Sequence, residues 1–343
     1  MINFRYHVVS LTAVFLALAV GLVLGSTVLN GPTLDALESR VNTLGRDNSQ
    51  LREQYSLLEE EVEREQDFAA EAAPMLLADR LTGRRAAVLV LPGGEEYAAG
   101  VAETLTLAGA SLTGQVTLTE KFTHPQHRLT DLLDLAHRVQ PASVDPATLP
   151  ANSDGVESSA ALLAAVLFDR ETPADPPADP PADPPAEEPA NGDPAPGDPA
   201  TGGGTVPADD RRAVLSAYAA AEFLEHDEAI SRPADVVVVV AGLPDAENDA
   251  DQRNQAMLTT VEQFSQFGPV VVAASGVAGD GNLVAEVRAD PELAGTVSTI
   301  DNASSPQGHI AAGLAVARHL AGAVGHFGNG DGAERLLPAA PAS

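Results

Sequence analysis

An uncharged apolar run near the N-terminus, Val8 to Leu29, constrains this chain more than any other feature. A helix of this length, rising about 1.5 Å per residue, reaches across a hydrocarbon core of about 30 Å. A cleaved signal peptide is the alternative, but its apolar region is shorter and a small-residue cleavage motif follows it. Here a second helical pattern follows directly, so we predict an uncleaved transmembrane anchor.

The charges that flank this run predict its orientation. Arg5 and the α-amino group precede it, whereas Asp35 and Glu38 follow it, together with Arg40. Positive charge tends to stay on the cytoplasmic side of a membrane. We therefore expect a single-pass protein of the cell membrane, in contact with lipid, with a cytoplasmic N-terminus and an extracytoplasmic C-terminal domain.

Small residues recur every four positions within the run, at Ala17, Gly21 and Gly25. Such a stripe lets two membrane helices approach closely and pack together. The alternative is that small residues are simply common in membrane helices. We predict that the stripe is a helix-packing surface, and the alternative that it has no packing role stays open.

A heptad pattern follows the apolar run, and its apolar spacing of 3 and 4 predicts a left-handed coiled coil. Asn48 falls at position a, where a buried amide pairs with its own copy and favours a parallel, in-register dimer. Asp47 at position g and Arg52 at the next position e can pair across that dimer. A single amphipathic helix lying on its own domain is the alternative. The a and d positions are Leu34, Leu37, Val41, Leu44, Asn48, Leu51, Tyr55, Leu58, Val62, Glu65 and Ala69.

Composition excludes several classes of function. The 343 residues carry a formal net charge of −30, which argues against a nucleic-acid partner because phosphate binding needs a basic face. The chain has no cysteine, so disulfides and thiolate metal sites are excluded. The sequence also contains no GxSxG elbow, Walker A or GxGxxG motif, so we predict no catalytic residues and no enzyme.

Short apolar strands alternate with helical patterns after residue 80. The run at 235–241 is mostly valine, which is typical of a strand buried on both faces. We therefore predict an α/β fold with an open, mostly parallel (Rossmann- or flavodoxin-like) sheet and helices on both faces. The expected strands are 85–91, 111–118, 235–241, 269–274 and 296–300, and the expected helices are about 95–107, 129–139, 156–168, 212–224, 251–267 and 306–321.

A segment rich in proline and aspartate, 172–207, interrupts this pattern with a repeated PADP motif. Proline removes backbone donors and the carboxylates repel one another, so we expect a disordered insertion with extended polyproline stretches. A boundary between two domains is the alternative. The predicted parts are the tail and anchor (1–30), the coiled-coil stalk (31–70), the first part of the α/β domain (80–171), the insertion (172–207), the second part of the α/β domain (208–322) and a flexible C-terminal tail (323–343).

Ligands of open α/β sheets bind beyond the carboxyl ends of the strands. Those ends carry glycines, here Gly93, Gly94, Gly242 and Gly276, which serve close ligand approach or only tight turns. Ser305 before Pro306 has the form of a helix N-cap and first helical residue. Carboxylates near these ends predict a cation-attracting rim, with solvated or capping side chains as the alternative. They are Glu95, Asp245, Glu247, Asp249, Asp280 and Asp301.

Histidines are the remaining metal-ligand candidates. His124 and His127 are three residues apart and could share a metal, although a surface loop explains them equally simply. His309, His319 and His326 form no recognised spacing, and the methionines at 1, 75 and 257 form no cluster. The metal ligands and any cofactor-binding residues are therefore left unassigned.

The segment from Ile2 to Ser26 resembles the start of the actinobacterial copper-transporter family typified by mycobacterial copper transport protein B. The likeness continues in the coil, in Arg85–Pro92, in Gly114–Thr119, in the valine strand and in Val297–Asn302 with the helix after it. The resemblance implies a copper homeostasis protein of the cell envelope that lowers intracellular copper. It also implies a channel-forming protein of a mycobacterial-type outer membrane as the alternative location.

The residues themselves do not demonstrate that activity. One apolar helix cannot enclose a pore, and the strands are shorter than those of a membrane barrel. We therefore expect copper as a transported substrate rather than a cofactor, and a homo-oligomer, as a parallel dimer, or partners to build the path. The alternative is a membrane-anchored scaffold or ligand-sensing α/β module that does not transport.

Overall fold

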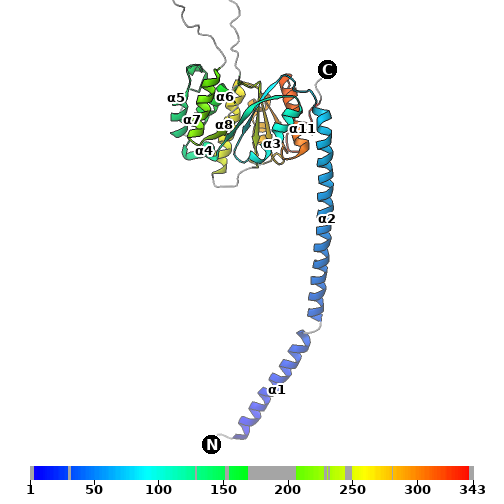
Figure 1. Cartoon of the computed structure of the whole chain (residues 1–343). Helices are drawn as coiled ribbons and strands as arrows, with labels where there is room; N and C mark the ends of the chain where they lie inside the picture. Colours follow the sequence, from blue (N-terminus) through cyan, green and yellow to red (C-terminus); the bar gives the residue numbers. More distant parts are fainter. Residues whose placement is uncertain are drawn as a thin grey trace, which may run out of the picture. The chain divides into compact units, whose positions relative to one another are not determined.

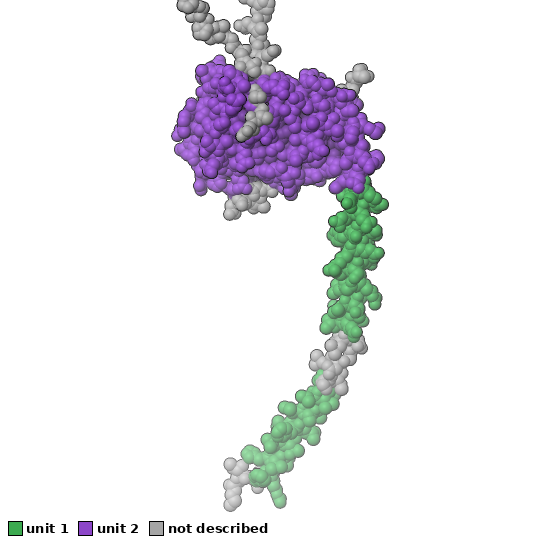
Figure 2. Space-filling model, in the orientation of Figure 1, with its two compact units in different colours: residues 1–65 green, residues 66–343 purple. Residues whose placement is uncertain are grey.

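The computed structural model of the protein describes residues 4–29, 32–127, 130–150, 154–168, 206–227, 230, 232–243, 249–279 and 281–339. These residues divide into two compact units, residues 1–65 and residues 66–343 (Figure 2). The expected insertion 172–207 lies outside the described residues up to residue 205.

The first unit consists of two helices. Helix α1 (Phe4–Leu29) contains a stretch, Phe4–Gly25, that is long and apolar enough to cross a bilayer, which is consistent with a single-pass membrane protein. Helix α2 begins at Pro32, and proline is favoured at a first helical position because its missing N–H would be unpaired there anyway. Helix α2 ends at Leu77, so its last turns belong to the second unit.

The second unit is built on a sheet of seven strands among the described residues, in the order β3-β2-β1-β4-β5-β6-β7. All neighbouring pairs are parallel except β2 with β3, which is antiparallel. The predicted α/β fold with an open, mostly parallel sheet is therefore confirmed. The strands are β1 (Arg85–Val90), β2 (Ser111–Leu118), β3 (Leu224–His226), β4 (Val236–Ala241), β5 (Val270–Ala274), β6 (Val297–Ile300) and β7 (His326–Phe327).

Helices cover both faces of this sheet, and alternate residues of each central strand enter different cores (Figure 1). In β4, Val237 and Val239 belong to the core beneath α5–α10, whereas Val236 and Val238 belong to the core beneath α3 and α11. Every residue of β4 is buried, as the valine run predicted. The helices are α3 (Glu95–Leu107), α4 (Glu120–Thr123), α5 (Asp131–Val139), α6 (Gly155–Leu167), α7 (Ala208–Ala220), α8 (Ala250–Phe267), α9 (Leu283–Ala289), α10 (Pro291–Thr296) and α11 (Pro306–Leu320), with 3-10 turns at Pro125–His127 and Pro146–Thr148.

Side-chain caps set the beginnings of several helices. The predicted cap at Ser305 is confirmed, because its hydroxyl oxygen accepts the backbone N–H of Gly308 at 3.1 Å. Asp154 caps α6 by accepting the N–H of Val156 at 2.9 Å. Asn282 caps α9 by accepting the N–H of Val284 at 2.9 Å. The caps at Asn282 and Ser305 begin the helices that follow β5 and β6.

The last turns of α2 belong to the core beneath α3 and α11. Ala69 is 6% exposed and Leu77 is fully buried, and a Cβ added to Gly313 of α11 would lie 2.7 Å from Leu77 Cδ2. Ala69, which the heptad pattern placed at position a, is thus covered by its own unit. Ala69 therefore cannot contact a second α2 helix at position a of a coiled coil.

Two expected boundaries were wrong. The helix expected over 212–224 is α7 and ends at Ala220, because Glu222 takes a positive φ of 62° that breaks the helix, and Leu224 lies in β3. Ordered structure also continues past residue 323, where we expected a flexible tail. His326 and Phe327 pair with Thr299 and Ile300 as β7, and Phe327 is 1% exposed.

Candidate functional sites

The carboxyl ends of the central strands meet at one edge of the sheet, as predicted. Backbone hydrogen bonds link the segments that follow β4, β5 and β6. Ser275 donates its N–H to the carbonyl of Ala241 at 3.0 Å, and Asn302 donates its N–H to the carbonyl of Gly276 at 2.7 Å. This edge is the place where an open α/β sheet would hold a ligand.

The crevice between β1 and β4, where strand order reverses, is closed by glycine backbone. A Cβ added to Gly242 would lie 2.0 Å from the carbonyl oxygen of Gly93, and one added to Gly94 would lie 2.5 Å from the carbonyl oxygen of Val240. Gly93 has a φ of +82°, a conformation that glycine adopts without strain. The glycines therefore allow the close packing of two strand-to-helix turns.

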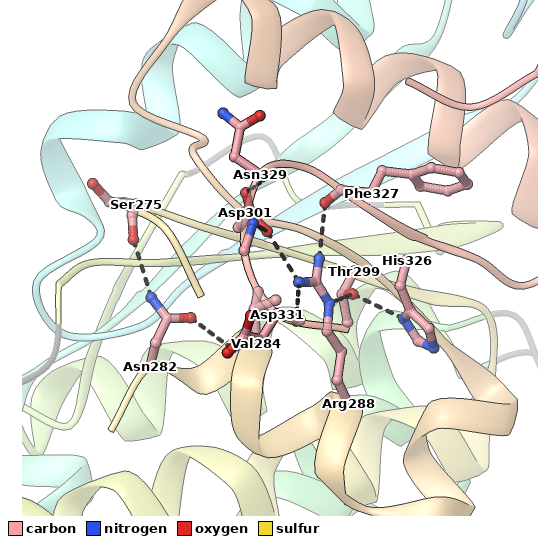
Figure 3. Close-up of polar contacts among 11 residues, drawn as sticks. Ser275, Asn282, Val284, Arg288, Thr299, Asp301, His326, Phe327, Asn329 and Asp331 are labelled. Atoms are coloured by element: carbon pink, nitrogen blue, oxygen red, sulfur yellow. Dashed lines mark hydrogen bonds and ion pairs between the residues drawn. The ribbon is translucent and has the colours of Figure 1, made fainter. Parts of the chain in front are cut away.

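Asp301, at the end of β6 (Figure 3), is the most enclosed of the predicted rim carboxylates that the structure describes, with 1% exposure. Its carboxylate accepts the backbone N–H groups of Asn329 at 2.7 Å and Gly330 at 3.0 Å, and a side-chain N–H of Arg288 at 3.0 Å. A Cβ added to Gly328 would lie 2.1 Å from its Oδ1, so the loop after β7 wraps directly over the carboxylate. Asp301 is thus an internal anchor for this loop rather than a solvent-facing cation ligand.

Arg288, from α9, donates four hydrogen bonds within the same cluster, from all three nitrogens of its guanidinium. Its guanidinium donates to Thr299 Oγ1 at 2.9 Å and to the carbonyls of Phe327 at 2.8 Å and Asp331 at 2.9 Å, besides Asp301 (Figure 3). Its side chain is 4% exposed, and burial lowers its pKa while Asp301 opposes that shift. The cluster therefore holds α9, β6 and the C-terminal loop together.

Of the other predicted rim carboxylates, the structure describes Glu95 and Asp249, which lie in different elements. Glu95 is exposed in the first turn of α3, and Asp249 pairs with Arg253 at 3.2 Å. Asp245, Glu247 and Asp280 lie outside the described residues.

His124 and His127 lie beside carboxylates rather than around a shared metal position. Their ring centroids are 5.8 Å apart, His127 Nδ1 is 2.7 Å from Asp131 Oδ2, and His124 Nε2 is 3.9 Å from Asp249 Oδ2. In the part of the chain that the structure describes, no three His, Cys, Asp or Glu side chains are grouped to hold a metal ion. The two histidines therefore form a partly exposed surface cluster with these carboxylates.

The three C-terminal histidines are built into the second unit. His319 Nδ1 lies 2.8 Å from Ser298 Oγ, and His309 packs against Gly100 of α3. His326 lies between two oxygens: its Nδ1 is 2.9 Å from Thr299 Oγ1, and its Nε2–H donates to the carbonyl of Ala294 at 3.2 Å. Burial is the main cause that lowers the pKa of each of these histidines, and Arg288 lowers that of His326 further.

These shifts predict that the second unit loses stability in mild acid. The folded-state pKa values lie below the unfolded value of about 6.5, so the unfolded state binds more protons as the pH falls below it. The free energy of unfolding should therefore decrease between about pH 7 and pH 5. Urea titrations of the detergent-solubilised chain should show this slope, and His326→Gln should reduce it. An unchanged slope for His326→Gln would contradict this assignment.

The predicted association surfaces lie on the N-terminal helices. A Cβ added to Gly21 or Gly25 meets no atom within 4 Å, so both positions are open in the single chain. Asn48, Asp47 and Arg52 are exposed along α2, and the apolar seam residues are 45% to 70% exposed. The seam residues described this way are Leu37, Val41, Leu44, Leu51, Tyr55, Leu58 and Val62.

Comparison with known proteins places the whole chain in one family. The model of the family described as "Copper transport outer membrane protein, MctB" matches residues 1–338. The chain belongs to the MctB family. Curated proteins named "Copper transporter MctB" from Mycobacterium tuberculosis and Mycobacterium bovis are each 28% identical, over 97% of this chain and 98% of theirs. The protein of that name from Mycobacterium leprae is 27% identical, over 98% of this chain and 99% of its own length.

The Arg288 cluster of this MctB family member was missed from the sequence. Arg288 and Asp301 are 13 residues apart in different elements, and the other partners come from the loop after β7, so no short motif connects them. Asp301 follows a short apolar strand directly in the sequence, and this position correctly predicted that it lies at the carboxyl edge of the sheet. It could not show that the carboxylate is enclosed.

Proposed function

We propose that this MctB family member acts in copper transport at the cell envelope and lowers intracellular copper, with copper as its substrate rather than a resident cofactor. The family match over residues 1–338 carries this proposal, because the relatives that are alike along nearly their whole length are named copper transporters. The likeness includes the membrane helix, the long helix α2 and the α/β unit together.

The copper path in this proposal forms by association. One helix, Phe4–Gly25, is the span that the described residues provide, and one helix cannot surround a pore. The open stripe of Ala17, Gly21 and Gly25 allows membrane helices to pack closely. Copies of the chain, or partner proteins, supply the remaining walls.

Pairing through α2 is the first step of that association. The exposed heptad seam buries its apolar side chains when a second α2 packs against it in parallel, and Asp47 of one chain then lies near Arg52 of the other. Membrane orientation follows from the flanking charges, with the second unit outside the cytoplasm. A cysteine substituted at Pro150 should then react with an impermeant maleimide on intact cells; reaction only after lysis would contradict this orientation.

Substitution of Asn48 by valine should stabilise the pair and loosen its stoichiometry. A buried amide at position a costs stability but selects a two-stranded, in-register coil, whereas valine packs without that constraint. Thermal unfolding and light scattering of the detergent-solubilised chain measure both effects. The exposed Ser49, one residue on, provides the control: Ser49→Val introduces the same residue outside the seam at similar helix propensity and should change neither property. An unchanged strict dimer without a gain in stability would place Asn48 outside the seam.

Copper accumulation tests the proposed function directly. A strain that lacks the protein should accumulate copper, and expression of the full chain should restore the normal content. Purified chain in copper-loaded liposomes should release copper. Gly21→Leu should reduce release, because leucine meets nothing within its own chain but blocks close helix contact, whereas Val20→Leu serves as the matched control. Normal copper content in the deletion strain, together with no release from liposomes, would contradict transport.

A membrane-anchored scaffold or sensor is the second candidate. One observation favours the scaffold: among the described residues, metal-ligating side chains form no group of three. A scaffold would leave copper content unchanged on deletion. The same accumulation assay therefore separates the two functions.

A further inference from the structure

Helix α2 presents two different apolar faces in its last turns. Ala69, Ala73 and Leu77 are spaced four apart and pack into the core beneath α3 and α11. On another side of the same turns, Phe68 and Met75 are 75% and 86% exposed. One face is therefore buried by its own unit, and the other is left in solvent.

Three exposed apolar residues of these turns, Phe68, Met75 and Leu76, lie on one side of the helix together with the partly buried Ala72. Phe68, Ala72, Met75 and Leu76 follow the spacing i, i+4, i+7 and i+8, which places them along one side of an α-helix. We call these four residues the Phe68–Met75 stripe. An exposed stripe with a phenylalanine and a methionine marks an interaction surface rather than scattered apolar residues.

We propose that the Phe68–Met75 stripe continues the self-association surface of α2 and that a second copy of the chain covers it. This inference rests on the proposed pairing of α2. The heptad seam cannot continue through Ala69, because that residue is 6% exposed against its own unit. If two α2 helices remain paired beyond Glu65, they must contact each other through a different apolar face. The Phe68–Met75 stripe is the apolar face that is exposed there.

The spacing of the sequence permits this change of face. Val62 to Glu65 and Glu65 to Phe68 are both three residues apart, and then Phe68 to Ala72 is four and Ala72 to Met75 is three. The heptad alternation thus resumes after one three-residue shift, which a coiled coil absorbs by overwinding locally.

The occupant follows from the symmetry of the pair. In a parallel, in-register pair each residue lies opposite its own copy, so an apolar stripe on one helix meets the same stripe on the other. A second copy therefore covers both stripes at once. The two α/β units are then joined by the ends of their α2 helices as well as by the seam.

Crosslinking through single cysteines tests the inference in the full chain, which has no native cysteine. Met75→Cys reports on the stripe and Leu51→Cys on the heptad seam. Asp67→Cys, exposed on another side of the same turn, is the control. With a short bismaleimide, the Met75 and Leu51 variants should form covalent dimers in severalfold higher yield than the Asp67 variant. Phe68→Ser should lower the Met75 yield severalfold and leave the Leu51 yield unchanged.

Each other outcome identifies what fails. Dimers through Leu51, with the Met75 variant at the level of the Asp67 control, would overturn the stripe while leaving the paired seam intact. Capture of the Met75 variant only on a different protein would overturn the second copy as the occupant. Absence of dimers through both Leu51 and Met75 would overturn the pairing itself, and the stripe with it.

Discussion

Replacement of Arg288 by methionine is expected to lower the free energy of unfolding of the second unit by about 3–5 kcal/mol. The reason is that the buried Asp301 carboxylate would lose its cationic partner. The carbonyls of Phe327 and Asp331 and the hydroxyl of Thr299 would also lose a donor. Urea unfolding of the detergent-solubilised chain measures the loss.

Two further variants separate this charge effect from a general effect of losing an arginine. Arg138→Met, at an exposed position in the last turn of α5, should change stability by less than about 0.5 kcal/mol. Asp301→Asn added to Arg288→Met should recover part of the loss, because the amide carries no charge and its oxygen still accepts the N–H of Asn329. The recovery is partial because the amide NH2 then faces the N–H of Gly330, which the second carboxylate oxygen accepts in the native chain. A double variant that is less stable than Arg288→Met would contradict an uncompensated buried charge as the cause.

The regular part of the fold was predictable because its signals are local. The valine run of β4 indicated a strand buried on both faces, and alternation of strands with helices indicated a parallel sheet. Ser305 and Pro306 marked the start of α11 correctly. Each of these conclusions needs only the periodicity or capping chemistry of a few neighbouring residues.

The edge strands were missed because they lack such signals. Strand β3 has three residues and β7 has two, and both pair with residues far away in the sequence. Their register depends on Glu222 breaking α7 and on the Arg288 cluster fixing the last loop. Tertiary contacts of this kind leave no periodic pattern in the sequence.

The site was predictable only as a location. Glycines and carboxylates at strand ends indicated the carboxyl edge, but the same residue types serve both ligand binding and tight packing. Only the approach of Gly242 to Gly93, and the two N–H groups on Asp301, show that packing is their role in the described residues. In contrast, heptad spacing predicted the apolar seam of α2. It did not predict that Ala69 is buried against its own unit.

The second large effect is expected for Arg211. Its side chain forms hydrogen bonds with the chain on both sides of the segment between Phe168 and Val206. This α7 side chain is 1% exposed and donates to the carbonyl of Val166, at the end of α6, and to the carbonyl of Val206 at 3.1 Å. Arg211→Met would leave buried carbonyls without these donors, at about 1–3 kcal/mol each. We expect the free energy of unfolding to fall by about 3 kcal/mol, measured by urea titration.

The neighbouring arginine provides a matched control for this prediction. Arg212 lies one residue further along α7, and its side chain is 55% exposed and pairs with Asp209 at 3.0 Å. Exposed pairs of this kind contribute about 0.3–0.5 kcal/mol, so Arg212→Met should have little effect. Native-state hydrogen exchange shows where the stability is lost. Phe168 and Ala234 form a bridge between the chain before the segment and the chain after it. Arg211→Met should raise the exchange rates of these two amides, because the last turn of α6 then opens more often. Equal losses for both arginines would show that Arg211 acts through charge alone and not through the two carbonyls.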